Sequence, residues 1–464
     1  MTGTRDGAIG RAERYFDDGG FLEELQRRVA IPTTSQETDS MPALQEYVSG
    51  EMTESLTKLG YECQVQPNPR TEYGPFLIAR RVEDPAKPTV LTYGHGDVIR
   101  GQDDQWRQGL SPWKIVVEGD RMYGRGTADN KGQHTINIAA LACVLQERGS
   151  LGFNSTILIE TGEETGSPGL ADFCKANKAA LKADALIGSD GPRLDHRRPT
   201  IFGGTRGTLN FNLKLAMREG GHHSGNWGGL LANPGIIMAH ALATITDARG
   251  QIKVPEWRPT TLTNSVRAAL ADAVVDAGEG APEINEDWGE KSLTPVERVF
   301  GWNSFEVLAF KTGNPDRPVN AIPPSAIAYC QLRFVVGTNP HDIIPALKRH
   351  LEKHGFGAIE IDQARDVIMN ATRLDPENPW AKFASASIEK TGGQKPNMLP
   401  NLGGSLPNEV FTDILGLPTV WVPHSYAACS QHAPNEHLLA PVARDGLRLM
   451  TGIFWDLGAQ GRPA

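Results

Sequence analysis

The sequence predicts an α/β protein built on a largely parallel sheet, with a smaller α+β unit joined to it. Apolar segments rich in β-branched residues alternate with helical segments up to about residue 190, which is typical of a parallel sheet. The pattern changes after Gly207, where a segment of alternating polar and apolar residues begins. The 464 residues also exceed the length at which one hydrophobic core usually stops growing, so two domains are expected.

Short apolar segments mark the strands of the expected large sheet. Before them, apolar residues recur every three or four positions from Met41 to Leu59, and Gly60 follows as a helix stop. The run QHTINIAALACVLQ at 133–146 is apolar enough to form a buried helix. The expected strands are residues 75–81 (PFLIARR), 88–93 (PTVLTY), 155–160 (STILIE) and 183–188 (ADALIG).

The smaller unit is expected at about residues 208–370, inserted in the larger one. The larger unit would then consist of residues 1–207 and 371–464. Residues 250–300 show little periodicity and are expected to form an irregular excursion. The elements expected here are a strand at 209–217, a helix at 233–248 opened by Pro234, a strand pair flanking Pro323-Pro324, a helix at 341–354 and a strand at 358–362.

Composition restricts the class of partner. The formal net charge of −9 gives no reason to expect nucleic acid or an anionic membrane, so a small molecule is the expected partner. No apolar stretch has the length of a membrane span, and the N-terminal residues do not resemble a signal peptide. Five cysteines without C-x-x-C spacing indicate reduced thiols, and the expected location is the cytoplasm. Cys429 is interpreted as a buried thiol, although it lies three residues before His432.

Four polar residues follow predicted strands. His95, Glu163, Glu164 and Asp190 each lie a few residues beyond the end of one. Ligand sites in parallel sheets collect at the carboxyl ends of the strands, so these side chains are expected on one rim.

Histidines and carboxylates set in polar or glycine-rich loops favour a metal site. Imidazole and carboxylate ligands suit zinc, or manganese and cobalt where oxygen predominates. A two-metal site needs a carboxylate that can bridge ions about 3.5–4 Å apart. Asp129 in GRGTADNKG is a candidate for this bridge because the glycines allow a tight turn around it.

The Glu163-Glu164 pair can divide two tasks. Neighbouring residues in a loop point in different directions, so one carboxylate can bind metal while the other acts as general base toward a water whose pKa the metal lowers. Asp97, two residues after His95, is placed to hold the second nitrogen of that imidazole.

Six short blocks contain these residues and their surroundings. They are GHGDV at 94–98, YGRGTADNKG at 123–132, ETGEETGSPGL at 160–170, SDGP at 189–192, HHSGNWGG at 222–229 and HAPNEH at 432–437. In this order they resemble the signature of the M20 metallopeptidase family, and the resemblance covers residues from about 15 to 455. Two further runs, GTRG at 204–207 and GGSLPNEVF at 403–411, look closest to its carnosinase-like dipeptidase branch.

The resemblance implies a fold and a set of metal ligands. The fold would be a zinc-exopeptidase-like three-layer catalytic domain interrupted by a smaller α+β lid that dimerises. One of two divalent ions would be held by His95, Asp129 and Asp190. The other would be held by Asp129, Glu164 and His432, with zinc the expected metal and manganese or cobalt as alternatives.

The resemblance also implies roles for the remaining site residues. Glu163 matches the general base and Asp97 the carboxylate that orients the first histidine. His223 matches a lid histidine that stabilises the oxyanion, reaching in from the partner subunit in dimeric members. Asn320 and Arg333 match lid positions that contact substrate, with an ordinary surface ion pair as the alternative for Arg333, while Ser405 either caps a turn or offers its backbone amide to a substrate carboxylate.

The function predicted from these residues is hydrolysis of an amide bond in a dipeptide or similar small carboxylate, by a homodimer. An N-acyl amino acid deacylase or an amidohydrolase on a non-peptide amide remains the alternative within enzymes. A non-catalytic binding protein is disfavoured because all five ligands and the base are present. Two departures from the family pattern, Gly96 and the run at 98–106, are expected to lie near the substrate.

Overall fold

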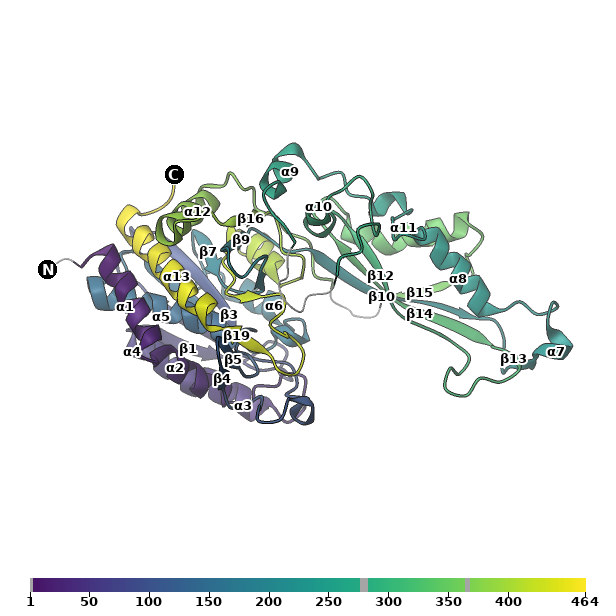
Figure 1. Cartoon of the computed structure of the whole chain (residues 1–464), viewed down its shortest axis with the longest axis horizontal. Coiled ribbons are helices and arrows are strands. Elements are labelled where there is room, and N and C mark those ends of the chain that lie inside the picture. Colours follow the sequence, from purple (N-terminus) through teal and green to yellow (C-terminus); the bar gives the residue numbers. More distant parts are fainter. Residues whose placement is uncertain (1–2, 276–282, 364–367) are drawn as a thin grey trace.

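The computed structural model of the chain describes residues 3–275, 283–363 and 368–464. The molecule is elongated, with an eight-stranded sheet and most helices at one end and a four-stranded sheet at the other (Figure 1). Both ends of the chain lie in the part that contains the larger sheet (Figure 1). Among the described residues, no helix combines the length and apolar character that a membrane crossing requires.

The large sheet is mixed, with a parallel centre. Its strand order is β1-β2-β6-β3-β7-β17-β9-β16, and the four strands from β6 to β17 run parallel to one another. β1 and β2 pair antiparallel because a loop, not a crossover helix, connects them. The prediction of a largely parallel sheet is therefore correct for the centre and for the edge pair β9–β16, but not for β1 and β2. The strands are β1 (Glu62–Gln66), β2 (Phe76–Arg81), β3 (Thr89–His95), β6 (Asn154–Glu160), β7 (Ala185–Gly188), β9 (Thr200–Phe202), β16 (Asn397–Leu399) and β17 (Thr419–Trp421).

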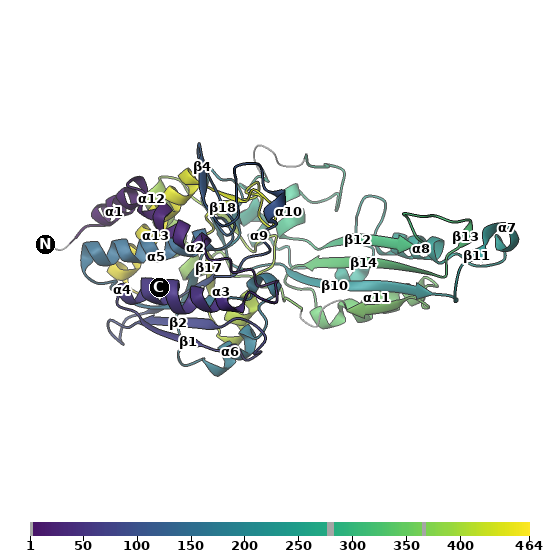
Figure 2. The same ribbon diagram turned by 90° about the horizontal axis from the view of Figure 1, so that it is seen from below.

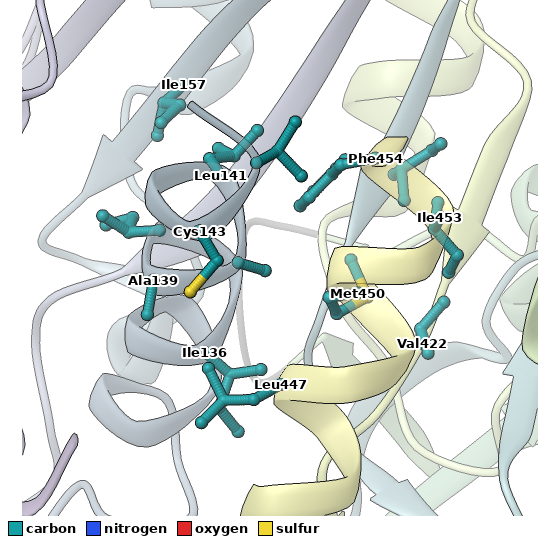
Figure 3. Packing of buried hydrophobic residues seen from close by; sticks show 14 of the residues in the cluster. Ile136, Ala139, Leu141, Cys143, Ile157, Val422, Leu447, Met450, Ile453 and Phe454 are labelled. Carbon is teal, nitrogen blue, oxygen red and sulfur yellow. The ribbon is translucent and has the colours of Figure 1, made fainter. Parts of the chain in front are cut away.

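Helices cover both faces of this sheet, which gives three layers. Successive strand residues point to opposite faces, so Val90 and Leu91 belong to different apolar clusters. Figure 3 shows one cluster, where side chains of α5 and α13 pack together over the sheet. Helices on this face are α1 (Arg5–Asp17), α2 (Gly20–Val29), α5 (Lys131–Arg148), α12 (Pro379–Gly392) and α13 (Ala440–Gln460), with α3 (Met41–Glu46), a π-helical turn (Tyr47–Met52) and α4 (Thr53–Lys58).

The opposite face is covered by shorter elements. α6 (Leu170–Ala176) and a π-helical turn at Val410–Ile414 pack there, against side chains such as Leu91 and Trp421. The stop predicted after the helix that begins at Met41 is confirmed, since Gly60 has a positive φ of 76° just beyond α4.

The four-stranded sheet is antiparallel and covered on one face. Its order is β12-β14-β10-β15, and alternate residues of β10 and β14 are buried. Met238 and Leu347, from the two covering helices, lie in one cluster with Phe211 and Leu332. The elements are β10 (Gly207–Ala216), β12 (Ser304–Thr312), β14 (Ser325–Phe334), β15 (Glu360–Gln363), α8 (Pro234–Ile245) and α11 (Ile343–Lys353).

The expected strand pair flanking Pro323-Pro324 is present, since β12 before the prolines pairs antiparallel with β14 after them, and one expectation for this part of the chain is wrong. The short strand β13 (Ala321–Ile322) also precedes the prolines, and it pairs with β11 (His222–His223). The excursion at 250–300 contains two helices, α9 (Asn264–Leu270) and α10 (Pro295–Phe300), while residues 276–282 lie outside the described residues. Their apolar side chains join the cluster that covers the second face of the large sheet.

Smaller pairs complete the fold. β4 (Val116–Glu118), β5 (Arg121–Tyr123) and β19 (His437–Leu439) form a three-stranded sheet. β8 (Pro192–Arg193) pairs with β18 (Ser425–Tyr426). The four-residue helix α7 (Ser224–Trp227) lies with β11 and β13 at the end of the molecule far from the large sheet (Figures 1 and 2).

Candidate metal centre

Three neighbouring parallel strands end at one rim of the large sheet. His95 is the last residue of β3, and Glu163 and Glu164 form a 3₁₀ turn three residues after β6. Asp190 follows β7 by two residues. Since β6 and β7 flank β3, the sheet brings these side chains together at the carboxyl ends of the strands.

Two groups of potential metal ligands meet at this rim and share Asp129. His95, Asp129 and Asp190 form one group, and each offers a ligand atom within 4.8 Å of the others. Asp129, Glu164 and His432 form the second group by the same criterion.

The two oxygens of Asp129 face different histidines. Its Oδ1 lies 3.0 Å from His95 Nε2, and its Oδ2 lies 3.0 Å from His432 Nε2. The same two nitrogens also lie near a second carboxylate: His95 Nε2 is 3.6 Å from Asp190 Oδ2, and His432 Nε2 is 3.1 Å from Glu164 Oε2. One carboxylate therefore stands between two separate donor sets, as a bridging ligand requires.

The electrostatics of the rim fit a bound cation. Burial raises the pKa of Asp190 to about 6, and burial together with the charge of Asp129 raises that of Glu164 to about 7. Hydrogen bonds to Asp129 and Glu164 raise the pKa of His432 to about 11. Asp190 Oδ2 is also buried and has no hydrogen-bond partner among the residues that the structure describes. Crowded carboxylates and an unsatisfied buried oxygen suit a divalent ion, and the imidazole and carboxylate donors are of the right type.

Glu163 lies beside these groups and is half-buried. Burial raises its pKa well above the usual value, with the neighbouring charge of Glu164 adding to the effect although His95 opposes it. Asp129 behaves in the opposite way: burial alone would raise its pKa, but hydrogen bonds with His432 and His95 hold it below the ordinary value. The two carboxyls thus differ in their affinity for a proton, as different roles require.

Asp97 fixes His95 in a way that differs from the expectation. Nδ1 of His95 lies 3.0 Å from the backbone oxygen of Asp97 and 3.5 Å from its Oδ1, so the closer acceptor is the carbonyl. A carbonyl only accepts, which makes Nδ1 the donor and leaves Nε2 for the rim. The carboxylate itself accepts from the backbone N–H groups of Glu163 and Glu164, at 3.2 and 3.1 Å. Ser35 donates its hydroxyl to the same carboxylate at 2.6 Å, and no sequence motif had indicated this residue.

Glu436 is a second residue that sequence reasoning missed. Its Oε1 accepts from the backbone N–H groups of Gly126, Ala128 and Asp129 at 3.0, 3.0 and 3.1 Å. Its Oε2 accepts from Arg125 at 2.7 Å, and its side chain is 1% exposed. One buried carboxylate therefore ties the loop of Asp129 to the loop that carries His432. The HAPNEH run contains Glu436 and was the available signal.

The loop of His432 has an unusual backbone. Ser430, His432 and Asn435 all have positive φ, between 57° and 64°, which is uncommon outside glycine and typical of a functional loop. Cys429, at its start, is buried beside Ala128 and Tyr426 and belongs to neither ligand group. Burial raises the pKa of its thiol to about 12, which favours the interpretation as a packed thiol.

A cavity of about 690 Å³ opens onto both ligand groups and Glu163. Arg333 and Ser405 also line it, and Arg333 Nη1 donates to Ser405 Oγ at 2.9 Å. Among the described residues Arg333 has no ion pair, and its hydrogen-bond partners are Ser405 and Gln331. Gly96 and the run at 98–106 do not line this cavity, so their expected position near the substrate stays a prediction. A Cβ on Gly96 would instead lie 2.5 Å from the ring of Tyr47.

His223 and Asn320 are not at this cavity in the same chain. Both lie at the tip formed by β11, β13 and α7, where Ser224 N donates to Asn320 O at 2.9 Å. Figures 1 and 2 show this tip at the opposite end of the molecule from β3. His223 is exposed, and its Nδ1 accepts from Gly225 N at 3.1 Å.

Known proteins resemble this chain in sequence. Residues 91–456 match the family described as Peptidase family M20/M25/M40. Over 488 aligned residues the chain is 23% identical to the Beta-Ala-His dipeptidase of Mus musculus, with 99% of this chain and 98% of that protein covered.

Solved structures share its fold. The M20 family metallo-carboxypeptidase Sso-CP2 of Sulfolobus solfataricus superposes with a TM-score of 0.78 at 25% identity, over 95% of this chain and 99% of that one. The dipeptidase Dug1p of Saccharomyces cerevisiae gives a TM-score of 0.79 at 20% identity, over 99% and 100% of the two chains.

Proposed function

The chain belongs to peptidase family M20/M25/M40 and is a metal-dependent hydrolase, and from this premise we propose that it cleaves the amide bond of dipeptides at a two-metal centre. The observation that carries the proposal is the pair of ligand groups sharing Asp129. The dipeptide substrate is supported by the mouse and yeast relatives, which are dipeptidases by name. Because the donors are imidazole and carboxylate, we assign zinc as the metal, with manganese or cobalt as alternatives.

Glu163 is the proposed general base. Divalent ions held by the two groups supply a Lewis acid that polarises the amide carbonyl and acidifies water. Glu163 takes the proton from the attacking water and returns it to the departing amine. Its burial, which raises its pKa, favours uptake of that proton. Asp97 supports the reaction by fixing both His95 and the backbone of the Glu163 turn.

Arg333 and Ser405 are the proposed ligands of the substrate carboxylate. They line the same cavity as Glu163 and are bonded to each other. No carboxylate accepts from Arg333 among the described residues, since its partners are Ser405 and Gln331. A planar guanidinium with only neutral partners is suited to a substrate carboxylate.

We also propose a homodimer formed through the four-stranded sheet. β12 is an edge strand of that sheet and exposes Val307, Leu308 and Phe310, while Ile236 of α8 is 61% exposed. An exposed apolar edge strand invites pairing with another chain. In such a dimer the tip would reach the partner's cavity, where His223 would stabilise the oxyanion and Asn320 would contact substrate.

Two further parts of the proposal concern location and organisation. A cytoplasmic location is supported by the five cysteines, all of which are free. The division into a catalytic domain of residues 1–207 and 371–464 and a lid of residues 208–370 is supported by the two separate sheets and their separate clusters.

The experiment is hydrolysis of dipeptides, N-acyl amino acids and aryl amides by metal-free protein reloaded separately with zinc, manganese and cobalt. We expect dipeptide cleavage that disappears on chelation and returns with metal. The variant Glu163→Gln should keep its metal content, and its turnover should fall about 10²–10⁴-fold. Cleavage confined to acyl or aryl amides would overturn the substrate class, and full turnover in the variant would overturn the base.

A further inference from the structure

One wall of the cavity that opens onto both ligand groups, the central cavity, is formed by apolar side chains. Most residues of this apolar wall lie outside the M20 sequence blocks. Phe300 is the last residue of α10, and Val299 precedes it, so both come from the segment that sequence reasoning had taken as irregular. Leu402 comes from a loop on the catalytic side and belongs to the same apolar cluster as Phe300. The apolar residues that line the cavity include Leu194, Val275, Val299, Phe300, Leu399 and Leu402.

We propose that this apolar wall binds the side chain of the substrate residue that carries the free carboxylate, and that it selects apolar side chains of leucine size. The inference rests on the proposed function, because Arg333 and Ser405 supply the carboxylate anchor. Ser405 is two residues from Gly403, and Gly403 packs directly against Val299. A carboxylate held at Ser405 therefore leaves the side chain on the same α-carbon next to this wall.

On its outer side, the apolar wall is a thin partition, formed by Val299 and Gly403, between the central cavity and a second cavity. Val299 lines both the central cavity and a second cavity of about 370 Å³, which Trp288, Trp302 and Phe305 also line. A Cβ on Gly403 would lie 3.0 Å from Val299 Cγ1 and 3.6 Å from Phe300 Cε1. The space available to a substrate side chain is thus set where Val299 meets Gly403.

Hydrogen bonds fix the Gly403 side of the partition. The carbonyl of Gly403 accepts from Arg206 Nε at 2.7 Å, and Leu402 N donates to Gly204 O at 2.7 Å. Ser405 Oγ donates to the carbonyl of Arg206 at 2.7 Å. Because these hydrogen bonds hold the loop, its backbone does not shift easily. Substitutions at Val299 or Gly403 therefore change the size of the space between the two residues.

The test is a dipeptide series with a constant N-terminal glycine and C-terminal glycine, alanine, leucine or phenylalanine. Burying a leucine side chain should raise kcat/KM about 10- to 100-fold over glycine in the wild-type enzyme. Val299→Ala opens the partition toward the second cavity and should raise the phenylalanine-to-leucine ratio. Gly403→Ala narrows the space and should lower kcat/KM for leucine more than kcat/KM for glycine. Val274→Ala, at a residue 69% exposed that does not line the cavity, is the matched control.

Calorimetric binding of free glycine, leucine and phenylalanine to the metal-loaded protein separates this inference from the proposed function. Dipeptide cleavage without a preference for leucine, or with ratios that neither variant shifts, would overturn the pocket and leave the peptidase standing. No peptide cleavage, together with leucine binding that exceeds glycine binding and responds to Val299→Ala, would overturn the peptidase and retain the pocket. Equal affinity for the three amino acids would overturn the proposed side-chain pocket, whatever the kinetic measurements show.

Discussion

The metal rim and the tip of the small sheet are built in opposite ways. The rim groups stand at the ends of buried parallel strands, and His95, Asp97 and Asp190 are at most 1% exposed. The tip consists of two-residue strands and a four-residue helix, and His223 is exposed there. One chain supplies every residue of both ligand groups at the rim, whereas the tip can take part in a reaction only if it contacts another surface. In the proposed mechanism, therefore, one domain supplies the bond-breaking groups and the other would have to deliver its histidine.

The largest effect is expected from the residue that the two ligand groups share. Asp129→Ala should remove both metal ions and lower turnover about 10⁴-fold or more, because both sources of carbonyl and water activation are lost. Asp190→Ala should remove one ion only, since Asp190 belongs to one group. Metal content by atomic emission and turnover of one dipeptide measure both variants. Equal metal loss in the two would show that Asp129 is not the bridge.

A substitution at the tip should lower turnover without changing the metal content. His223→Ala should keep its metal content and lower kcat about 10²–10³-fold, as removal of an oxyanion donor does. His222→Ala is the matched control, because His222 is the neighbour of His223 in the sequence but its ring packs against Trp227.

Mixing the two inactive variants sharpens this contrast. In a dimer of His223→Ala with Glu163→Gln, one cavity has an intact Glu163 and receives an intact His223 from the partner. Mixed subunits should therefore recover up to about one quarter of wild-type activity per protein, if half of the dimers are mixed and each carries one working site. No recovery, with mixed dimers shown by mass spectrometry, would mean that His223 does not act from the partner.

The same contrast explains what the sequence could predict. His95, Asp190 and the Glu163-Glu164 pair follow apolar β-branched strands, so their position at one rim follows from strand period and sheet topology. The antiparallel β1 and β2 could not be told apart from parallel strands, since periodicity carries no direction.

The missed features depend on contacts between distant segments. Glu436 meets Asp129 across more than 300 residues, which no local pattern reports. Tyr47 fills the space beside Gly96, where a Cβ would lie 2.5 Å from its ring, and this contact favours glycine at that position. α10 is a different case: Thr294, Pro295 and Glu297 form a capping box with proline at the first turn, a local signal that was present and not used.

Glu436 allows the rim to be weakened without touching a ligand. Glu436→Gln replaces one acceptor oxygen by an amide that faces Arg125, so the loop of Asp129 loses part of its anchor. Metal affinity should fall about 10–100-fold, as for other outer groups that orient metal ligands. Titration of the metal-free protein with zinc measures this, and turnover at saturating zinc should return close to the wild-type value. Turnover that stays low at saturating zinc would indicate a role in chemistry and not in positioning.

The smallest effect is expected at Ser35, which reaches the rim only through Asp97. Ser35→Ala removes one of the hydrogen bonds that hold the carboxylate of Asp97, while the backbone N–H groups of Glu163 and Glu164 still donate to it. Losing one charge-assisted bond costs about 1.5 kcal/mol, so kcat should fall no more than about tenfold, with metal content unchanged.

Ser35→Thr should restore most of the rate because it returns a hydroxyl, and Ser49→Ala, at an exposed position, should have no effect. A loss in Ser35→Ala that Ser35→Thr does not restore would assign the effect to packing. Since Asp97 contacts both His95 and the turn of Glu163, a change in kcat with constant KM would show that the rim depends on the position of its base as well as on its metals.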